Sequence, residues 1–112
     1  MAKLTLRVDF GPGKAVGPGK IRLLEAIRDS GSISRAGRTL GMSYRRAWML
    51  IDNLNRTFRG PVVTARPGGK RGGGARLTPF GRMLVTRYRA IERRSQTAAA
   101  RELAALQRAL RR

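Results

Sequence analysis

The feature that most constrains the fold is a pair of helix signals separated by a very short break, in the segment GSISRAGRTLGMSYRRAW at residues 31–48. Ser32 is placed to cap a short helix that runs through Gly41. After the break, Ser43 is placed to cap a second helix that continues to residue 58. Two helices joined by so short a break predict a helix-turn-helix.

The helix at residues 43–58 has two distinct faces. Its apolar residues recur at helical spacing and predict one buried stripe, formed by Ala47, Leu50, Ile51, Leu54 and Phe58. The opposite face carries Arg45, Met49, Asp52 and Arg56. A second helix with an outward cationic and aromatic face is the kind that enters the major groove of DNA.

The elements before this motif are predicted to be a strand, a loop and a helix. Apolar and polar residues alternate from Leu4 to Phe10, which predicts a half-buried strand. The stretch GPGKAVGPGK at residues 11–20 is rich in glycine and proline and predicts a loop. From Lys20, apolar residues on one side predict a helix that ends near Ser30 and Gly31.

Two short strands, VVTAR and ARLT, follow the helix-turn-helix and predict a hairpin. A hairpin in this position is a wing, with its tip at residues 67–74. Lys70 and Arg71 lie at the apex, where they are expected to reach phosphate or the adjacent minor groove. A glycine-rich loop that orders only on binding remains an alternative for this tip.

The C-terminal third predicts one long helix. Thr78 can cap it with Pro79 at its first position, and no helix breaker follows before Arg112, so the helix would be roughly 50 Å long. Its apolar stripe shifts by one residue between Ala98 and Leu103 and is too long for a small domain to cover. A second copy of the chain is the simplest cover, which predicts a homodimer.

The predicted fold is therefore mainly α with a small β-hairpin: a winged helix-turn-helix with an N-terminal strand and a long C-terminal helix. Residues 1–80 would form the DNA-binding domain, with the N-terminal strand and loop at 1–19. Residues 79–112 would form the dimerisation helix.

Composition narrows the function. The chain of 112 residues carries 25 Lys and Arg against 6 Asp and Glu, a formal net charge of +19, which indicates a polyanionic partner such as double-stranded DNA. Cysteine and histidine are absent and the acids stand mostly beside arginines, where solvated ion pairs are expected. We therefore expect no enzyme activity, no cofactor and no metal site. No apolar run is long enough to span a bilayer, which favours a cytoplasmic protein without a membrane partner.

The segment at 31–48, the following Leu-Asn, and the wing sequence GGKRGGGARLTPFG together resemble the DNA-binding domain of the ModE family of molybdate-responsive transcription regulators. The similarity covers Gly19 to about Arg94. A weaker likeness to LysR-type helix-turn-helix domains shows in Ala36, Leu40, Ser43 and Leu77-Thr78. The resemblance implies a winged dimer on a palindromic operator, with Ser43, Tyr44, Arg45 and Arg46 at the DNA. In that family the oxyanion is bound by separate C-terminal modules, which the sequence does not contain, so molybdate sensing does not carry over.

The predicted function is sequence-specific transcription regulation of the ModE type, with Arg45 as the first choice for a base contact. The expected DNA-contacting residues are Arg35, Arg38, Ser43, Tyr44, Arg45, Arg46, Trp48, Met49, Lys70 and Arg71. Trp48 lies at the edge of the apolar stripe, so core packing is an equal alternative for it. Two other functions remain open: a nucleoid-type protein that coats DNA without sequence preference, and a small oxyanion-binding protein that uses the glycine-rich residues 17–20.

Overall fold

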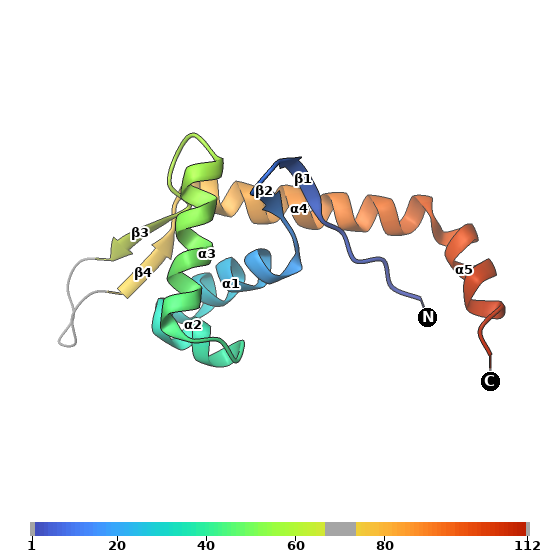
Figure 1. Cartoon of the computed structure of the whole chain (residues 1–112), viewed down its shortest axis with the longest axis horizontal. Coiled ribbons are helices and arrows are strands. Elements are labelled where there is room, and N and C mark those ends of the chain that lie inside the picture. Colours follow the sequence, from blue (N-terminus) through green and yellow to red (C-terminus); the bar gives the residue numbers. More distant parts are fainter. Residues whose placement is uncertain (1, 67–73, 112) are drawn as a thin grey trace.

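The computed structural model describes residues 2–66 and 74–111. Its elements in chain order are β1 (Val8–Gly11), β2 (Lys14–Val16), α1 (Pro18–Ser30), α2 (Ile33–Thr39), α3 (Tyr44–Thr57), β3 (Val63–Arg66), β4 (Gly74–Leu77), α4 (Pro79–Ala98) and α5 (Ala100–Arg108). The molecule is elongated, 55 × 31 × 23 Å, with the β3–β4 hairpin at one end and α5 at the other (Figure 1). The predicted mainly α class is confirmed.

Helices α1, α2 and α3 form a body around one hydrophobic core. Helix α1 ends where Gly31 adopts a left-handed φ of 72° and donates its amide to the Ile27 carbonyl at 2.8 Å. The core consists of Val16, Ile21, Leu23, Leu24, Ile27, Ile33, Ala36, Ala47, Ile51, Leu54, Val62, Ala75, Leu77, Val85 and Tyr88. Because Val85 and Tyr88 belong to α4, the first half of that helix packs on the body.

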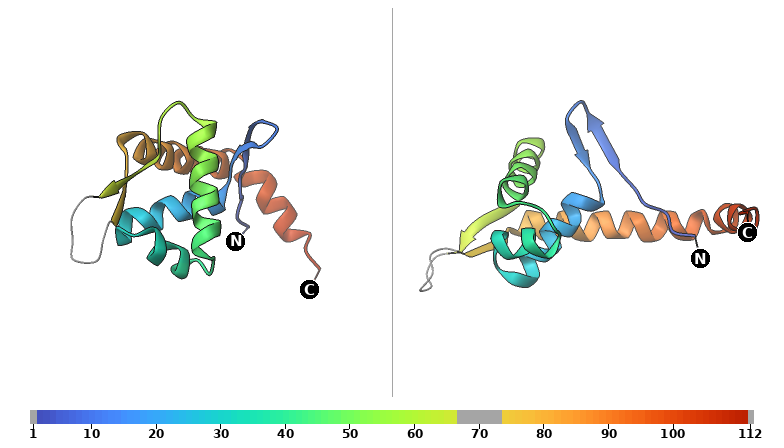
Figure 2. Two further views of the ribbon diagram at one scale, coloured as in Figure 1. Left: turned by 60° about the vertical axis from the view of Figure 1, so that its left-hand side comes forward. Right: turned by 60° about the horizontal axis from the view of Figure 1, so that its bottom comes forward.

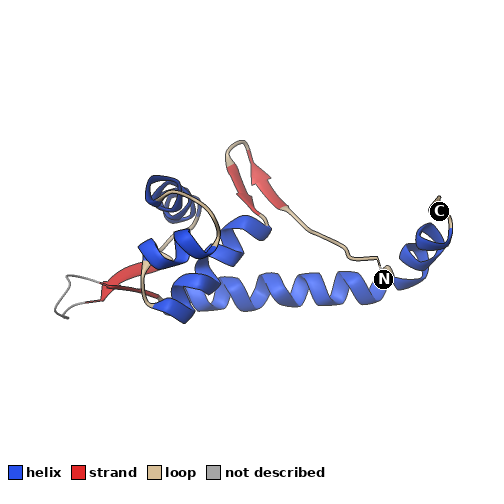
Figure 3. Cartoon of the chain, turned by 90° about the horizontal axis from the view of Figure 1, so that it is seen from below, coloured by secondary structure: helices blue, strands red, loops and turns tan. Residues whose placement is uncertain are grey.

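Strands β3 and β4 pair antiparallel, from Val63 opposite Leu77 to Arg66 opposite Gly74. The Ala75 amide donates to the Gly31 carbonyl at 2.9 Å, which anchors β4 to the turn between α1 and α2. This hairpin beside a helix-turn-helix makes the fold a winged helix-turn-helix, as predicted (Figure 3). Lys70 and Arg71 lie outside the described residues.

The prediction of a strand from residue 4 to residue 10 is wrong over its first half. Residues 2–7 run extended beside α4 without a strand partner, and the Gln96 side chain bonds to the Leu4 amide at 2.7 Å and to the Ala2 carbonyl at 2.9 Å. The Tyr88 hydroxyl donates to the Leu6 carbonyl at 2.6 Å. The alternating pattern therefore reflects packing on a helix, and only the residues from Val8 onward pair in a sheet.

The prediction of a loop over residues 11–20 is also wrong in part. Lys14–Val16 forms β2, which pairs antiparallel with β1, and α1 starts at Pro18. The glycines of this stretch make the hairpin turn, since Gly11 and Gly13 both have positive φ. Val16 is only 2% exposed, so its burial favours an extended segment that sequence composition alone does not indicate.

The C-terminal third does not form the single helix that we predicted. Helix α4 ends at Ala98, Ala99 has a ψ of 7°, and α5 turns away from the α4 axis (Figures 1 and 2). The break falls where the apolar stripe shifts register, just after Ser95 and Thr97, which are weaker helix formers than alanine. Ala2 lies near this bend, because its carbonyl accepts a hydrogen bond from the Gln96 side chain.

Candidate nucleic-acid interface

The turn between α2 and α3 depends on two glycines. Gly41 has a φ of 69°, which glycine adopts without steric cost. The Met42 amide donates to the Gly37 carbonyl at 2.9 Å, and a Cβ on Gly37 would lie 3.2 Å from the Met42 carbonyl oxygen. The missing side chain at Gly37 therefore lets the turn pass close to α2, and this contact helps to set the direction in which α3 leaves the body.

Serine caps begin both helices of the motif, as predicted. The Ser32 hydroxyl accepts from the Arg35 amide at 3.1 Å, and the Ser43 hydroxyl accepts from the Arg46 amide at 3.1 Å. Neither helix has an acidic residue in its first turn. The positive end of each helix dipole is therefore not offset by a local carboxylate and adds to the positive potential here.

Helix α3 divides into a buried face and an exposed face, as its periodicity predicts. Ala47, Ile51 and Leu54 are buried in the core, with Leu50 and Phe58 packed against it. Arg45, Met49, Asp52 and Arg56 are all exposed. The face available for a ligand therefore begins with a cation and a methionine in its first two turns, and ends with the Asp52–Arg56 ion pair.

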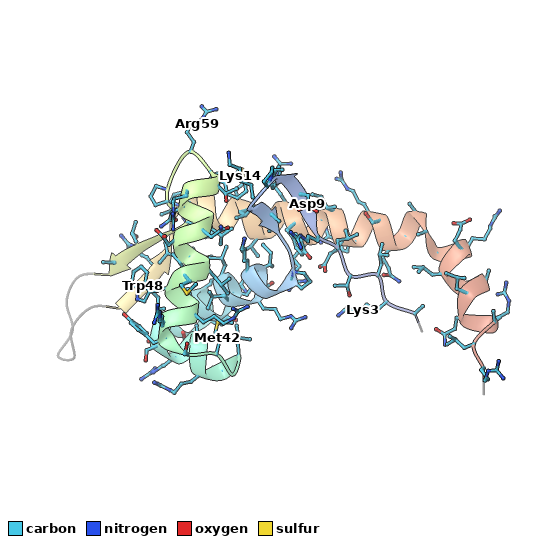
Figure 4. All side chains as sticks on the ribbon, viewed as in Figure 1. Lys3, Asp9, Lys14, Met42, Trp48 and Arg59 are labelled. Atoms are coloured by element: carbon cyan, nitrogen blue, oxygen red, sulfur yellow. The ribbon has the colours of Figure 1, made fainter. Side chains whose placement is uncertain are left out.

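Trp48 packs on a neighbouring side chain of α3 instead of in the core. It is 43% exposed and makes an edge-to-face contact with Tyr44, with ring centroids 6.3 Å apart. Figure 4 shows it on the side of α3 that faces the wing strands. Tyr44 and Trp48 therefore present exposed aromatic surface between α3 and the wing.

The acidic residues are concentrated away from the start of α3. In the described part of the chain, five of the six carboxylates, all except Glu102, pair with Arg7, Arg28, Arg56 or Arg89. This confirms that most acids form ion pairs. Over the same residues no ion pair involves Arg35, Arg38, Arg45 or Arg46, and Arg38 donates to the Ser34 hydroxyl at 3.0 Å. The surface over α2 and the start of α3 therefore keeps its positive charge.

The predicted contact residues that the structure describes share their exposure and their place on two consecutive helices. All are exposed, and all lie on α2 or on the cap and first turns of α3: Arg35, Arg38, Ser43, Tyr44, Arg45, Arg46, Trp48 and Met49. Lys70 and Arg71 are not among the described residues. These exposed cationic and aromatic side chains on the two helices of the motif have the chemistry to contact phosphates and base edges.

A family match covers the helix-turn-helix and the strands of the wing. Residues 19–82, which contain α1 to β4 and the start of α4, match the model of the bacterial regulatory helix-turn-helix proteins, lysR family. The chain belongs to this lysR family. The weaker LysR-type likeness in the sequence is thus confirmed, and the matched range contains every residue of the predicted contact set.

Curated relatives add a narrower similarity to the lysR-family match. The chain is 43% identical over 98 residues to the molybdenum transport protein ModE of Azotobacter vinelandii and 50% identical over 80 residues to the molybdenum-pterin-binding protein MopB of Rhodobacter capsulatus. It is 42% identical over 71 residues to the DNA-binding transcriptional dual regulator ModE of Escherichia coli K12. These matches cover 88%, 71% and 63% of the chain but only 36%, 30% and 27% of the relatives. The ModE resemblance is confirmed over this shared part.

Sequence reasoning missed one set of residues at the edge of this lysR-family motif. The Lys20 ammonium donates to the Asn53 side-chain oxygen at 2.6 Å and to the Ala15 carbonyl at 2.7 Å, and the Asn53 amide donates to the Gly13 carbonyl at 3.1 Å. These bonds attach the β1–β2 hairpin to α3. Arg7 lies in the same region. No local pattern could have revealed the contact, because its members are far apart in the sequence.

No helix in the described part of the chain is both long and apolar enough to cross a membrane. Over those same residues, no group of three or more acidic, histidine or cysteine side chains is placed to hold a metal ion.

Proposed function

We propose that this chain is a sequence-specific, DNA-binding transcription regulator of the ModE type. It binds a palindromic operator as a dimer, through the helix at 43–58 and the wing at 67–74. One observation carries the proposal: Arg45 stands exposed, without an ion-pair partner among the described residues, on a capped second helix of a lysR-family motif. Arginine at such a position can donate two hydrogen bonds to a guanine edge.

The neighbouring residues have supporting roles in this proposal. Arg35 and Arg38 grip backbone phosphates and set the register of α3 in the groove. Tyr44, Trp48 and Met49 supply apolar surface that can contact a thymine methyl group. Lys70 and Arg71, at the tip of the wing, are proposed from the sequence alone to contact phosphate or the minor groove.

Apolar surface at the C-terminal end supports the dimer. Helix α5 has no buried residue, Leu106 and Leu110 are 68% and 64% exposed, and Ile91 on α4 is 44% exposed. A second copy of the chain would remove these side chains from water. Two copies of α3 would then enter successive major grooves, with half-sites about 34 Å apart.

The names of the relatives point to molybdenum as the first regulatory context to test. Those that the chain resembles are named for molybdenum transport, for molybdenum-pterin binding or for transcription regulation. We propose that genes for molybdenum uptake or use are among the targets. The chain spans about a third of the length of these relatives. The proposal therefore draws only on the segment that the chain shares with them, and not on the rest of those proteins.

Selecting bound fragments from genomic DNA tests the proposal. The selected duplexes should share an inverted repeat, bind two chains in analytical ultracentrifugation, and bind about 10³-fold or more tightly than random duplex at physiological salt. An affinity ratio near one would instead identify a nucleoid-type protein that coats DNA, which the net charge of +19 also allows. Calorimetry with molybdate on the same chain tests the oxyanion-binding alternative, and the regulator proposal predicts no heat of binding.

A further inference from the structure

Three cationic side chains from separate parts of the chain line one open pocket beside α3. Arg7 comes from the extended N-terminal segment, Lys20 from the first turn of α1, and Arg46 from the first turn of α3. The rest of the lining is formed by Ala15, Gly17, Gly19, Met42 and Leu50. A Cβ on Gly17 would lie 3.9 Å from the Arg7 side chain, so the arginine stem packs close to the backbone here.

The positive charge of this pocket is only weakly offset. Arg7 pairs with Asp9 at 3.2 Å, but both side chains are more than 60% exposed, and such pairs are screened by water. Lys20 bonds only to neutral oxygens of Ala15 and Asn53, which leaves one of its three N–H donors for a ligand. Burial and the charge of Arg7 lower the Lys20 pKa. An anion in the pocket would stabilise the charged form of Lys20 against both its burial and the repulsion from Arg7.

The pocket lies where a DNA backbone would pass if α3 entered the groove. Each residue advances about 100° around a helix, so Arg46 sits on one flank of α3 while Tyr44 and Trp48 occupy the other. A helix about 10–12 Å across fills a major groove about 12 Å wide, which places phosphates along both of its flanks. The flank of Arg46 therefore faces one strand of the duplex.

We infer that Arg7, Lys20 and Arg46 form a clamp for one backbone phosphate in each half-site of the operator. The inference rests on the proposed function, because it requires α3 in the major groove. It separates two adjacent arginines by role: Arg45 reads a base edge, whereas Arg46 holds a phosphate with the N-terminal segment and α1. The ligand chemistry is that of a tetrahedral oxyanion, and its position on the flank of α3 favours the DNA backbone over a free ion.

The clamp is tested by the salt dependence of DNA binding, using Arg7→Gln and Arg46→Gln. Each variant should lower the slope of log K against log salt by about 0.9 for each protomer, and so by about 1.8 for the dimer on its operator. It should also weaken all duplexes by the same factor and leave the preferred sequence unchanged. Arg94→Gln is the matched control, because it removes the same charge from an exposed position on α4. Its slope should stay within error of the wild-type slope. Thermal melting by circular dichroism checks that every variant is folded.

A second arm locates the phosphate. Operators that carry a neutral methylphosphonate at the same backbone position in both half-sites should include one such position that weakens wild-type binding but has no further effect on the Arg7→Gln/Arg46→Gln double variant. Two results would overturn the clamp alone. In the first, the salt slopes of the Arg7→Gln and Arg46→Gln variants equal that of Arg94→Gln. In the second, inorganic phosphate binds in calorimetry in a way that depends on Arg7, while the DNA slopes stay unchanged. A wild-type chain that fails to bind any duplex would overturn the proposed function as well.

Discussion

The helix-turn-helix body, with the first half of α4 packed on it, and the C-terminal arm, residues 89–111, are both helical, but only the body has a core. Helix α1 buries Ile21, Leu23, Leu24 and Ile27, whereas α5 buries no residue at all. The body is also fixed by side-chain caps at α2, α3 and α4, while α5 starts without one. The difference indicates that contacts within the chain determine the body, whereas the described residues leave the apolar side of α5 exposed.

Paired leucine substitutions should separate the two regions most strongly. Leu54 is fully buried and Leu106 is 68% exposed. Leu54→Ala should lower the free energy of unfolding by about 2–5 kcal/mol, because it leaves a cavity in the core. Leu106→Ala should change the stability of the body by about 0.5 kcal/mol or less, yet weaken self-association. Urea unfolding and sedimentation equilibrium measure the two effects, and equal losses of stability would contradict the comparison.

A glycine pair tests the junction between the body and α4. A Cβ at Gly81 would lie 2.2 Å from the Val62 carbonyl oxygen, whereas a Cβ at Gly19 would meet nothing within 4 Å. Both glycines lie in the first turn of a helix that begins with proline. Gly81→Ala should destabilise the protein by about 1–3 kcal/mol because the backbone must shift. Gly19→Ala should be neutral or slightly stabilising. Thermal melts measure both variants, and a Gly81→Ala variant as stable as the wild type would show that the contact between Gly81 and Val62 is not tight.

An ion-pair cluster that joins the arm to the body should make their contact sensitive to acid. Arg89 on α4 donates to Glu25 on α1 at 2.6 and 3.0 Å and to Glu92 at 2.6 Å. The bonds from Arg89 hold the pKa of Glu25 below its usual value. Their contribution to stability is therefore present above the unfolded pKa of glutamate, near 4.3, and is lost as the pH falls through the lowered folded pKa.

Urea unfolding of wild type and Arg89→Gln at pH 7 and pH 3 measures this contribution. The wild type should lose about 1 kcal/mol more than the variant, since the partial exposure of the cluster screens the charges. Arg94→Gln serves as the control and should lose as much as the wild type. The same acid-induced loss in all three proteins would show that the cluster does not stabilise the fold.

The body could be predicted from sequence because its signals are local. Ser32, Ser43 and Thr78 mark helix starts through bonds to amides three residues later, and the stripe of α3 is visible in its own spacing. The exposed cationic face followed directly from that stripe. These contacts lie within one or two turns of chain, so a residue pattern is enough to reveal them.

Two of the errors, the N-terminal strand and the loop that follows it, lie where distant segments meet. Residues 2–7 are extended because Gln96 and Tyr88 hold their backbone, and β2 exists because Val16 is buried against the body. The clamp residues Arg7, Lys20 and Arg46 likewise converge only after folding. The bend at Ala99 follows no proline or glycine. Hydrophobic periodicity and composition reflect residues that are close together in the sequence. They therefore could not reveal contacts between segments that are far apart in it.

The most direct test of the central claim, that the exposed face of α3 reads DNA sequence, is the sequence preference of Arg45→Ala. Selection from a random duplex library should show that the variant loses its preference for one base pair in each half-site. Its affinity for the best wild-type site should fall by about 1–3 kcal/mol for each contact that is removed, while Arg94→Ala keeps the wild-type preference. An unchanged consensus sequence for Arg45→Ala would contradict the account.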